Sequence, residues 1–82
     1  MHWTDDGIVL SLRPHGETSA VVQLLTRDMG RHAGLVRGAL GKRLSGVYQP
    51  GNLVTASWSG RLAENLGSFS CELVESYAAR VL

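Results

Sequence analysis

The segment Ala20-Val21-Val22-Gln23-Leu24-Leu25-Thr26 decides the fold class, together with the residues that follow it. It is apolar on both faces except at Gln23, as expected of a buried strand. Asp28-Met29-Gly30 comes next, and its glycine can adopt the positive φ that a tight hairpin turn requires. Residues 31–38 then supply another apolar strand. The centre of the chain is therefore predicted to be an antiparallel hairpin.

Segments on both sides of this hairpin show the period-two alternation of strands. Residues 7–13 precede the hairpin and residues 52–62 and 68–74 follow it, and glycines, ten among 82 residues, punctuate the whole chain. The side chains expected on the buried faces are Ile8, Leu10 and Leu12, then Val54, Ala56 and Trp58, and finally Phe69, Cys71 and Leu73. Residues 13–16, Arg-Pro-His-Gly, fit a type I turn. The sequence thus predicts an all-β domain of five strands.

Residues 38–51 interrupt the strand pattern. They contain four glycines and Pro50 and carry no apolar period, so we expect a long loop and no full helix there. Five short strands must curl on themselves to bury a core and remove their edges. An SH3-like barrel and a Greek-key oligonucleotide-binding (OB) barrel both meet this need. The long connection after the third strand favours the five-stranded OB-fold barrel.

Residues 76–82 differ from the rest of the chain. Ser76 could cap a helix, and Tyr77, Ala78, Val81 and Leu82 fall at helical spacing on one side. The pattern stops after two turns. We therefore expect a barrel domain over residues 1–76 and the start of a C-terminal helix over residues 77–82, within a longer protein.

Composition excludes several classes of protein. The chain is 44% apolar and 18% charged, which excludes a disordered tail. No apolar run approaches the roughly 20 residues that cross a bilayer, and the N-terminus lacks the order of a signal peptide. Cys71 is the only cysteine, so neither a disulfide framework nor a cysteine-based zinc site can form within the chain. A domain this small without disulfides is expected in the cytoplasm.

No pattern of catalytic residues emerges. Residues 38–43, Gly-Ala-Leu-Gly-Lys-Arg, suggest a phosphate-binding loop, but the required first glycine is Val36 and the required Ser or Thr is Arg43. Histidines 2, 15 and 32 lie in separate segments without carboxylates at ligand spacing. Cys71 is expected to be a buried, inert thiol. We expect no enzymatic activity, no cofactor and no metal.

Basic residues concentrate in one part of the chain. The net charge is +1, but residues 13–43 carry a net charge of +4 between two acidic flanks. The basic residues of this stretch are Arg13, Arg27, Arg31, Arg37, Lys42 and Arg43. Cationic side chains beside flexible glycines can follow a sugar-phosphate backbone. Ordinary scattering of surface charge over turns is the alternative interpretation.

The basic loop supplies the candidate site residues. Arg37, Lys42 and Arg43 flank and occupy it, and Arg13, Arg27 and Arg31 are expected to support them. Tyr48 lies in the same loop and is the candidate for stacking on a base. Trp58 and Phe69 are expected in the core instead. Binding through phosphates would show little sequence preference.

Several segments, in this order and spacing, resemble the RecO family of bacterial DNA-repair proteins. They are Trp3-Thr4-Asp5-Asp6-Gly7-Ile8-Val9-Leu10, Arg13-Pro14-His15-Gly16-Glu17-Thr18-Ser19, Leu24-Leu25-Thr26-Arg27-Asp28-Met29-Gly30-Arg31-His32, Val36-Arg37-Gly38 and Gln49-Pro50-Gly51-Asn52-Leu53-Val54. The resemblance extends from Trp3 to about Glu75. It implies an N-terminal OB domain that precedes a helical domain absent from this chain.

The resemblance also implies a function. Proteins of the RecO family are recombination mediators without catalytic turnover: they bind single- and double-stranded DNA, anneal complementary strands, partner RecR, engage single-stranded-DNA-binding protein and help to load RecA. The basic loop of the family follows the glycine after the third strand, which carries its role to Lys42 and Arg43, with Arg37 just before. This chain has Ala39 and Leu40 where the family often has basic residues.

Two alternatives remain open. The barrel could be a protein-interaction module that docks RecR or another partner while DNA is held elsewhere in the protein. An exposed apolar patch that includes Val21 or Leu25 would favour this interpretation. A translation-type RNA-binding barrel is the third interpretation, and competition between RNA and DNA of the same length would test it.

Overall fold

The computed structural model describes residues 1–62 and 66–77, and this part of the chain is all-β. Five strands follow one another: β1 (His2–His15), β2 (Ser19–Thr26), β3 (Gly30–Val36), β4 (Leu53–Ser59) and β5 (Gly67–Glu75). The predicted all-β class is confirmed. A helix is predicted over residues 77–82, and residues 78–82 lie outside the described part of the chain.

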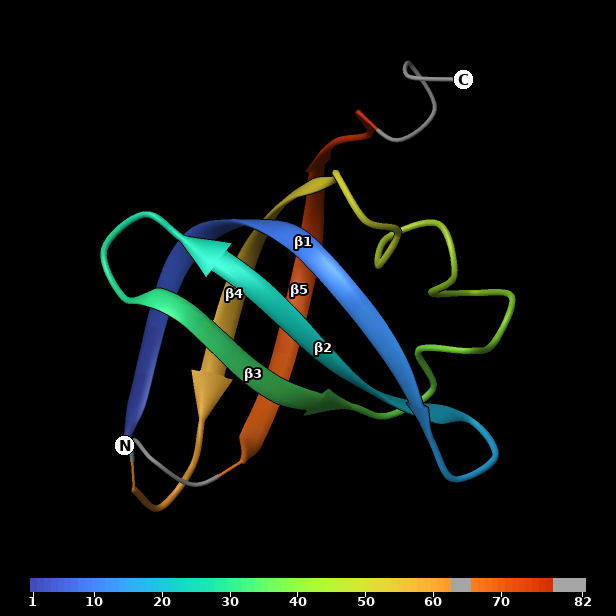
Figure 1. Ribbon diagram of the computed structural model, residues 1–82, viewed down its shortest axis with the longest axis horizontal. Helices are drawn as coiled ribbons and strands as arrows, with labels where there is room; N and C mark the ends of the chain where they lie inside the picture. The colour runs from blue at the N-terminus through green and yellow to red at the C-terminus, as the bar shows by residue number, and fades with distance from the viewer. Residues whose placement is uncertain (63–65, 78–82) are drawn as a thin grey trace.

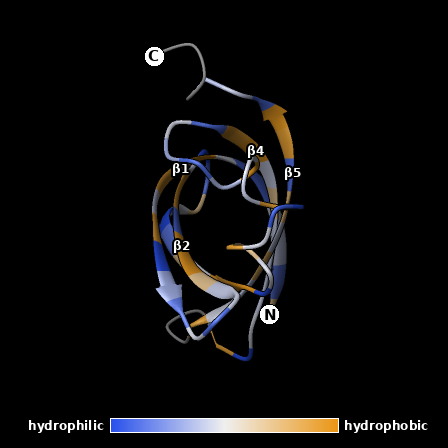
Figure 2. Cartoon of the chain, turned by 90° about the vertical axis from the view of Figure 1, so that its right-hand side faces the viewer, coloured by the Kyte–Doolittle hydropathy of each residue, from blue (hydrophilic) through white to orange (hydrophobic). Residues whose placement is uncertain are grey.

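The strands close into a barrel in the order β1-β2-β3-β5-β4, with β4 returning to β1 (Figure 1). Neighbouring strands are antiparallel except β3 and β5, which are parallel and pair only at Gly34–Gly67 and Leu35–Ser68. This arrangement is the five-stranded OB-fold barrel that the sequence predicts. Figure 2 looks at the molecule from the side and shows the strands curving around a common axis.

A β-bulge in β1 changes which of its residues face the core. Val9 pairs with Leu24 and Ser11 pairs with Gln23, so Leu10 has no partner of its own. Before the bulge the inward residue is Val9, which is fully buried, and Ile8 and Leu10 face outward. After it Leu12 packs against the core. The predicted inward set of Ile8, Leu10 and Leu12 is therefore wrong for its first two members, because the extra residue shifts the alternation.

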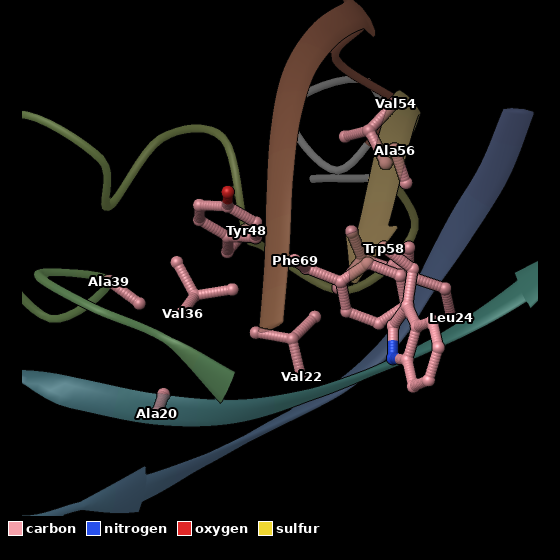
Figure 3. Close-up of a cluster of buried hydrophobic side chains, with 11 residues drawn as sticks. Ala20, Val22, Leu24, Val36, Ala39, Tyr48, Val54, Ala56, Trp58 and Phe69 are labelled. Atoms are coloured by element: carbon pink, nitrogen blue, oxygen red, sulfur yellow. The ribbon is translucent and has the colours of Figure 1, made fainter. Parts of the chain in front are cut away.

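The core fills the barrel with large side chains from every strand. Trp58 is fully buried and donates a hydrogen bond from Nε1 to the carbonyl oxygen of Ala33 at 3.1 Å. Phe69 lies beside it (Figure 3), which confirms the two as core residues. The other core residues are Val9, Ala20, Val22, Leu24, Val36, Ala39, Tyr48, Val54 and Ala56.

Two connections differ from the prediction: the β1–β2 turn in its position, and the loop after β3 in its burial. The β1–β2 turn spans residues 16–18, with Gly16 at positive φ, so Arg13 to His15 belong to β1 rather than to a turn. Residues 37–52 contain no helix or strand, as predicted. This loop is not merely exposed, however, because Ala39 and Tyr48 are buried in the core. It covers the end of the barrel at which β3 ends (Figure 1).

Candidate nucleic-acid interface

The outer face of β1, β2 and β3 presents three rows of side chains that follow from the strand register. One row is Arg13, Val21 and Leu35, the next is Ser11, Gln23 and Ala33, and the third is Ile8, Leu25 and Arg31. These residues alternate with inward ones such as Val22 and Leu24, which are fully buried. The outer face defined by these nine residues is where the barrel exposes polar, basic and apolar side chains together.

Arg37, Lys42 and Arg43 lie at one end of this outer face. Arg37 directly follows β3, and all three residues are exposed. The amide of Leu40 donates a hydrogen bond to the carbonyl oxygen of Thr18 at 3.0 Å, which ties the start of the loop to the β1–β2 turn. Within the described part of the chain, none of the three basic side chains forms an ion pair. Their charge is therefore available to a ligand.

Internal hydrogen bonds give the 37–52 loop a defined shape. Gly38 has a φ of 76°, a left-handed conformation that favours glycine, and its carbonyl accepts a hydrogen bond from the Gly41 amide at 3.0 Å. The buried Asn52 donates from Nδ2 to the carbonyl oxygens of Gly46 and Val47, at 2.9 and 3.3 Å. The amides of Leu44 and Ser45 donate to the carbonyl oxygen of Gly41, at 3.3 and 3.0 Å, and these bonds span the segment that carries Lys42 and Arg43.

Arg27 and Arg31 lie at the opposite end of β2 and β3 (Figure 1). β2 has eight residues, so its two ends are seven steps apart, a span of about 23 Å at ~3.3 Å per step. Arg27 also approaches Asp6, with its Nη2 3.8 Å from Oδ2 of the carboxylate. The six predicted basic residues therefore form two groups rather than one compact patch, with Arg13 at the same end as Arg37.

The turn that carries Arg27 is held by the Asp5 carboxylate. Its Oδ2 accepts hydrogen bonds from the amides of Asp28, at 2.7 Å, and Met29, at 3.4 Å. The bond from Asp28 is the main reason that the pKa of Asp5 lies below its usual value. Asp5 is therefore a structural anchor of the β2–β3 turn.

Tyr48 does not offer an exposed ring. Only 2% of the residue is exposed, and its hydroxyl accepts a hydrogen bond from the amide of Cys71 at 3.2 Å. Figure 3 shows it beside Val36, at the edge of the core. Burial raises its pKa well above the usual tyrosine value, and burial likewise raises the pKa of the Cys71 thiol to about 11. The structure therefore places Tyr48, the residue predicted to stack on a base, in the core rather than on the surface of the loop.

A cavity of about 380 Å³ opens between β3 and β5, next to Arg37. Leu35 and the hydroxyl-bearing Ser68 and Ser70 line it together with Tyr48. Sequence reasoning missed these residues. Only the parallel β3–β5 pairing brings the serines beside Arg37, and nothing local in the sequence signals that pairing.

The third row of the outer face continues onto β4 as an apolar row. Ile8 pairs with Leu25 on β2 and with Leu53 on β4, so the three side chains are lateral neighbours. Leu25 is 51% exposed, and a cavity of about 330 Å³ lies among these residues and Arg27. On β5 the residue paired with Leu53 is Glu75, and the exposed Leu73 and Val74 precede it at the end of β5 that Figure 2 colours as hydrophobic. The prediction that Leu73 faces the core is therefore wrong.

Residues 1–62 and 66–77 contain no helix long and apolar enough to cross a membrane. In the same ranges, no group of three or more His, Cys, Asp or Glu side chains is arranged to hold a metal ion.

Comparison with known proteins gives the chain a family. The family model described as "Recombination protein O N terminal" matches residues 1–77. DNA repair protein RecO of Bradyrhizobium sp. (strain ORS 278) is 60% identical over 82 residues, which are all of this chain and 33% of that protein. The proteins of the same name from Rhodospirillum centenum and Mesorhizobium japonicum are 56% and 50% identical, again over the whole chain. The chain spans about a third of the length of these relatives. It belongs to the RecO family of DNA repair proteins and corresponds to the N-terminal part of that family.

Proposed function

We propose that this barrel, over residues 1–76, is the DNA-binding domain of a recombination mediator that works in the cytoplasm. The observation that carries the proposal is the exposed group of Arg37, Lys42 and Arg43, without carboxylate partners among the described residues, at one end of the outer face. Arg13 lies at the same end, and Arg31 extends basic charge to the other end of β3. Family membership supports the same function.

The proposed mechanism is electrostatic. Each guanidinium or ammonium group that contacts a phosphate releases condensed counterions, and the gain in entropy drives binding. Two strands held by these side chains have part of their mutual repulsion neutralised, which favours annealing. No bond is made or broken in this mechanism, so the domain acts without catalytic turnover.

The same proposal includes the partners implied by the family resemblance. The domain would hold single- or double-stranded DNA while RecR and single-stranded-DNA-binding protein engage the protein, so that RecA can be loaded onto the strand. Contacts to phosphates, rather than to base edges, would make binding largely independent of sequence.

The test measures the salt dependence of binding to a labelled single-stranded oligonucleotide by fluorescence anisotropy. The double variant Lys42→Glu/Arg43→Glu should lower affinity and reduce the slope of log K against log salt by about 0.7 for each lost contact. Arg61→Glu is the matched control, because Arg61 is an exposed basic residue that follows β4 and lies outside the outer face. Wild-type affinity and slope in the double variant would show that the loop does not bind DNA.

A second candidate function rests on the apolar row of Ile8, Leu25 and Leu53. Leu25 is exposed and Ile8 and Leu53 are half-buried, and contiguous apolar surface of this kind is typical of protein-binding sites. If the barrel docks RecR through this row, Leu25→Glu should abolish capture of RecR and leave affinity for DNA unchanged. Glu17→Lys, in the β1–β2 turn, serves as a charge-changing control. Unchanged capture by the Leu25→Glu variant would exclude this row as the RecR surface.

A further inference from the structure

We propose that the cavity between β3 and β5 receives one unpaired nucleobase and so gives the interface a preference for single strands over duplexes. This inference rests on the DNA-binding function proposed above. Neither the charge pattern nor the family match assigns a role to this cavity, whose serines lie on β5, away from the basic stretch of the sequence.

The cavity exists because β3 and β5 part after a short contact. They pair at Gly34–Gly67 and Leu35–Ser68, after which β3 ends at Val36 and the chain turns away into the loop. β5 continues to Glu75. The space left beside β5 is not filled by another strand, and Leu44 and Tyr48 of the loop line its far side.

The walls of the cavity suit a flat aromatic ring. Leu35, Leu44, Tyr48 and Phe69 all contribute to the lining, and the volume of about 380 Å³ is at the lower end of the range for small-molecule sites. Such a space accommodates one heterocycle and not a stacked base pair. Apolar and aromatic walls favour burial of a base in the same way that they favour any aromatic ring.

The rim of the cavity combines a positive charge with hydroxyl groups. Arg37 lines it from the end of β3, and Ser68 and Ser70 line it from β5. In the described part of the chain, neither serine hydroxyl has a hydrogen-bond partner and Arg37 has no ion pair. A nucleotide presents the complementary pair of features, a phosphate for the guanidinium and a polar base edge for the hydroxyls. Because a hydroxyl both donates and accepts, it can match any of the four bases.

The back wall is preorganised and uncharged. The hydrogen bond from the Cys71 amide to the Tyr48 hydroxyl, at 3.2 Å, joins the loop to β5 and holds the tyrosine in place. The thiol of Cys71, which also lines the cavity, is protonated at neutral pH because burial raises its pKa to about 11. No negative charge therefore opposes a nucleotide from within the cavity.

The position of the cavity fits a strand that runs along the outer face. Leu35 belongs both to the cavity and to the outer row that contains Val21 and Arg13. A strand bound by Arg37, Lys42 and Arg43 could thus turn one base into the cavity. A duplex would first have to unpair and unstack that base, which costs a few kcal/mol. The cavity therefore favours single strands, whereas the basic loop binds both forms.

The experiment compares affinities for a single-stranded oligonucleotide and a duplex of the same length at one salt concentration. Ser70→Trp should place a ring at the mouth of the cavity. Met29→Trp is the control, because Met29 is an exposed residue of the β2–β3 turn, at the opposite end of β3 from the cavity, and does not line it. We expect Ser70→Trp to lower single-strand affinity about tenfold, the scale of one lost base stack, with duplex affinity unchanged. Met29→Trp should behave like the wild type.

A second measurement needs no variant and so does not depend on how a variant folds. The wild-type chain should bind a single strand of abasic sites about tenfold more weakly than a strand with bases, although the phosphates are the same. Equal affinity for the two strands, or wild-type affinities for Ser70→Trp, would overturn the base pocket while leaving phosphate binding intact. Loss of both single-strand and duplex binding in Lys42→Glu/Arg43→Glu reports on the proposed function instead.

Discussion

Two glycines set how closely the large aromatic side chains can lie against the barrel wall. A Cβ atom built on Gly34 would lie 2.5 Å from a ring carbon of Phe69, and one built on Gly67 would overlap the carbonyl oxygen of Ser59 and the indole of Trp58. These two glycines form one of the two residue pairs that join β3 to β5. The closure of the barrel at this seam therefore requires residues without a side chain.

Gly67→Ala should destabilise the barrel by about 2 kcal/mol or more, because the methyl group meets backbone on one side and a fully buried indole on the other. Urea unfolding followed by tryptophan fluorescence measures the change. Gly46→Ala is the matched control: nothing lies within 4 Å of its added Cβ, and its φ is not positive. It should stay within about 0.5 kcal/mol of the wild type. Equal stability of the two variants would contradict the close packing at the seam.

At the scale of the elements, alternation in the sequence is enough to predict five strands and the whole inward face of one of them, β4, whereas on β5 the predicted Leu73 is exposed. Val54, Ala56 and Trp58 all face the core as expected. The inward face of β1 is not predictable in this way. The bulge at Leu10 arises from the pairing of β1 with β2, and the alternation of apolar residues in the sequence does not indicate it. The burial of Tyr48 is equally non-local, since it depends on β5, more than twenty residues further along the chain.

Asn52 is the residue that holds the 37–52 loop in place, since its side chain is fully buried and bonds two loop carbonyls. Asn52→Ala should leave those carbonyls without these donors and cost about 1–3 kcal/mol. Hydrogen exchange should show faster exchange of the Val47 amide, whose hydrogen bond to the Leu44 carbonyl lies within the loop.

The control for this variant is Gln49→Ala in the same loop, where the side chain is exposed. Its exchange rates and stability should match those of the wild type. If Asn52→Ala also weakens DNA binding, Lys42 and Arg43 depend on the shape of the loop. Unchanged exchange at Val47 would show that Asn52 is not the anchor of the loop.

For the whole molecule, the distribution of charge predicts part of the candidate interface. The basic side chains of the loop and of β3 are exposed, as a solvated basic stretch would be. Their division into two groups about 23 Å apart follows from the length and direction of β2, which the charge pattern does not contain. The cavity at the β3–β5 seam arises only when the barrel closes, and a sequence without a signal for that parallel pairing cannot reveal it.

Closure of the barrel also sets its stability at alkaline pH, through the hydrogen-bonded pair of the buried Tyr48 and the partly buried Cys71. Burial raises the pKa of Cys71 from 9.0 to about 11 and that of Tyr48 above its usual value of 10.0. Well below pH 9 both groups are protonated in the folded and the unfolded chain, so their contribution is constant. Between pH 9 and 11 the unfolded chain releases the thiol proton while the folded chain keeps it, so the free energy of unfolding falls as pH rises. Tyr48 adds to this loss above pH 10.

The fall that Cys71 causes should be about 1 kcal/mol, because the thiol is partly exposed and solvent screens some of the effect of burial. Urea titrations at pH 8, 9 and 10 measure it. In Cys71→Ala, which has no thiol to titrate, the free energy of unfolding should change little between pH 8 and 9.5 and fall only as Tyr48 begins to contribute. If the variant and the wild type lose stability in parallel over that range, another group causes the loss at alkaline pH. The fold would then not hold the Cys71 thiol in its neutral form.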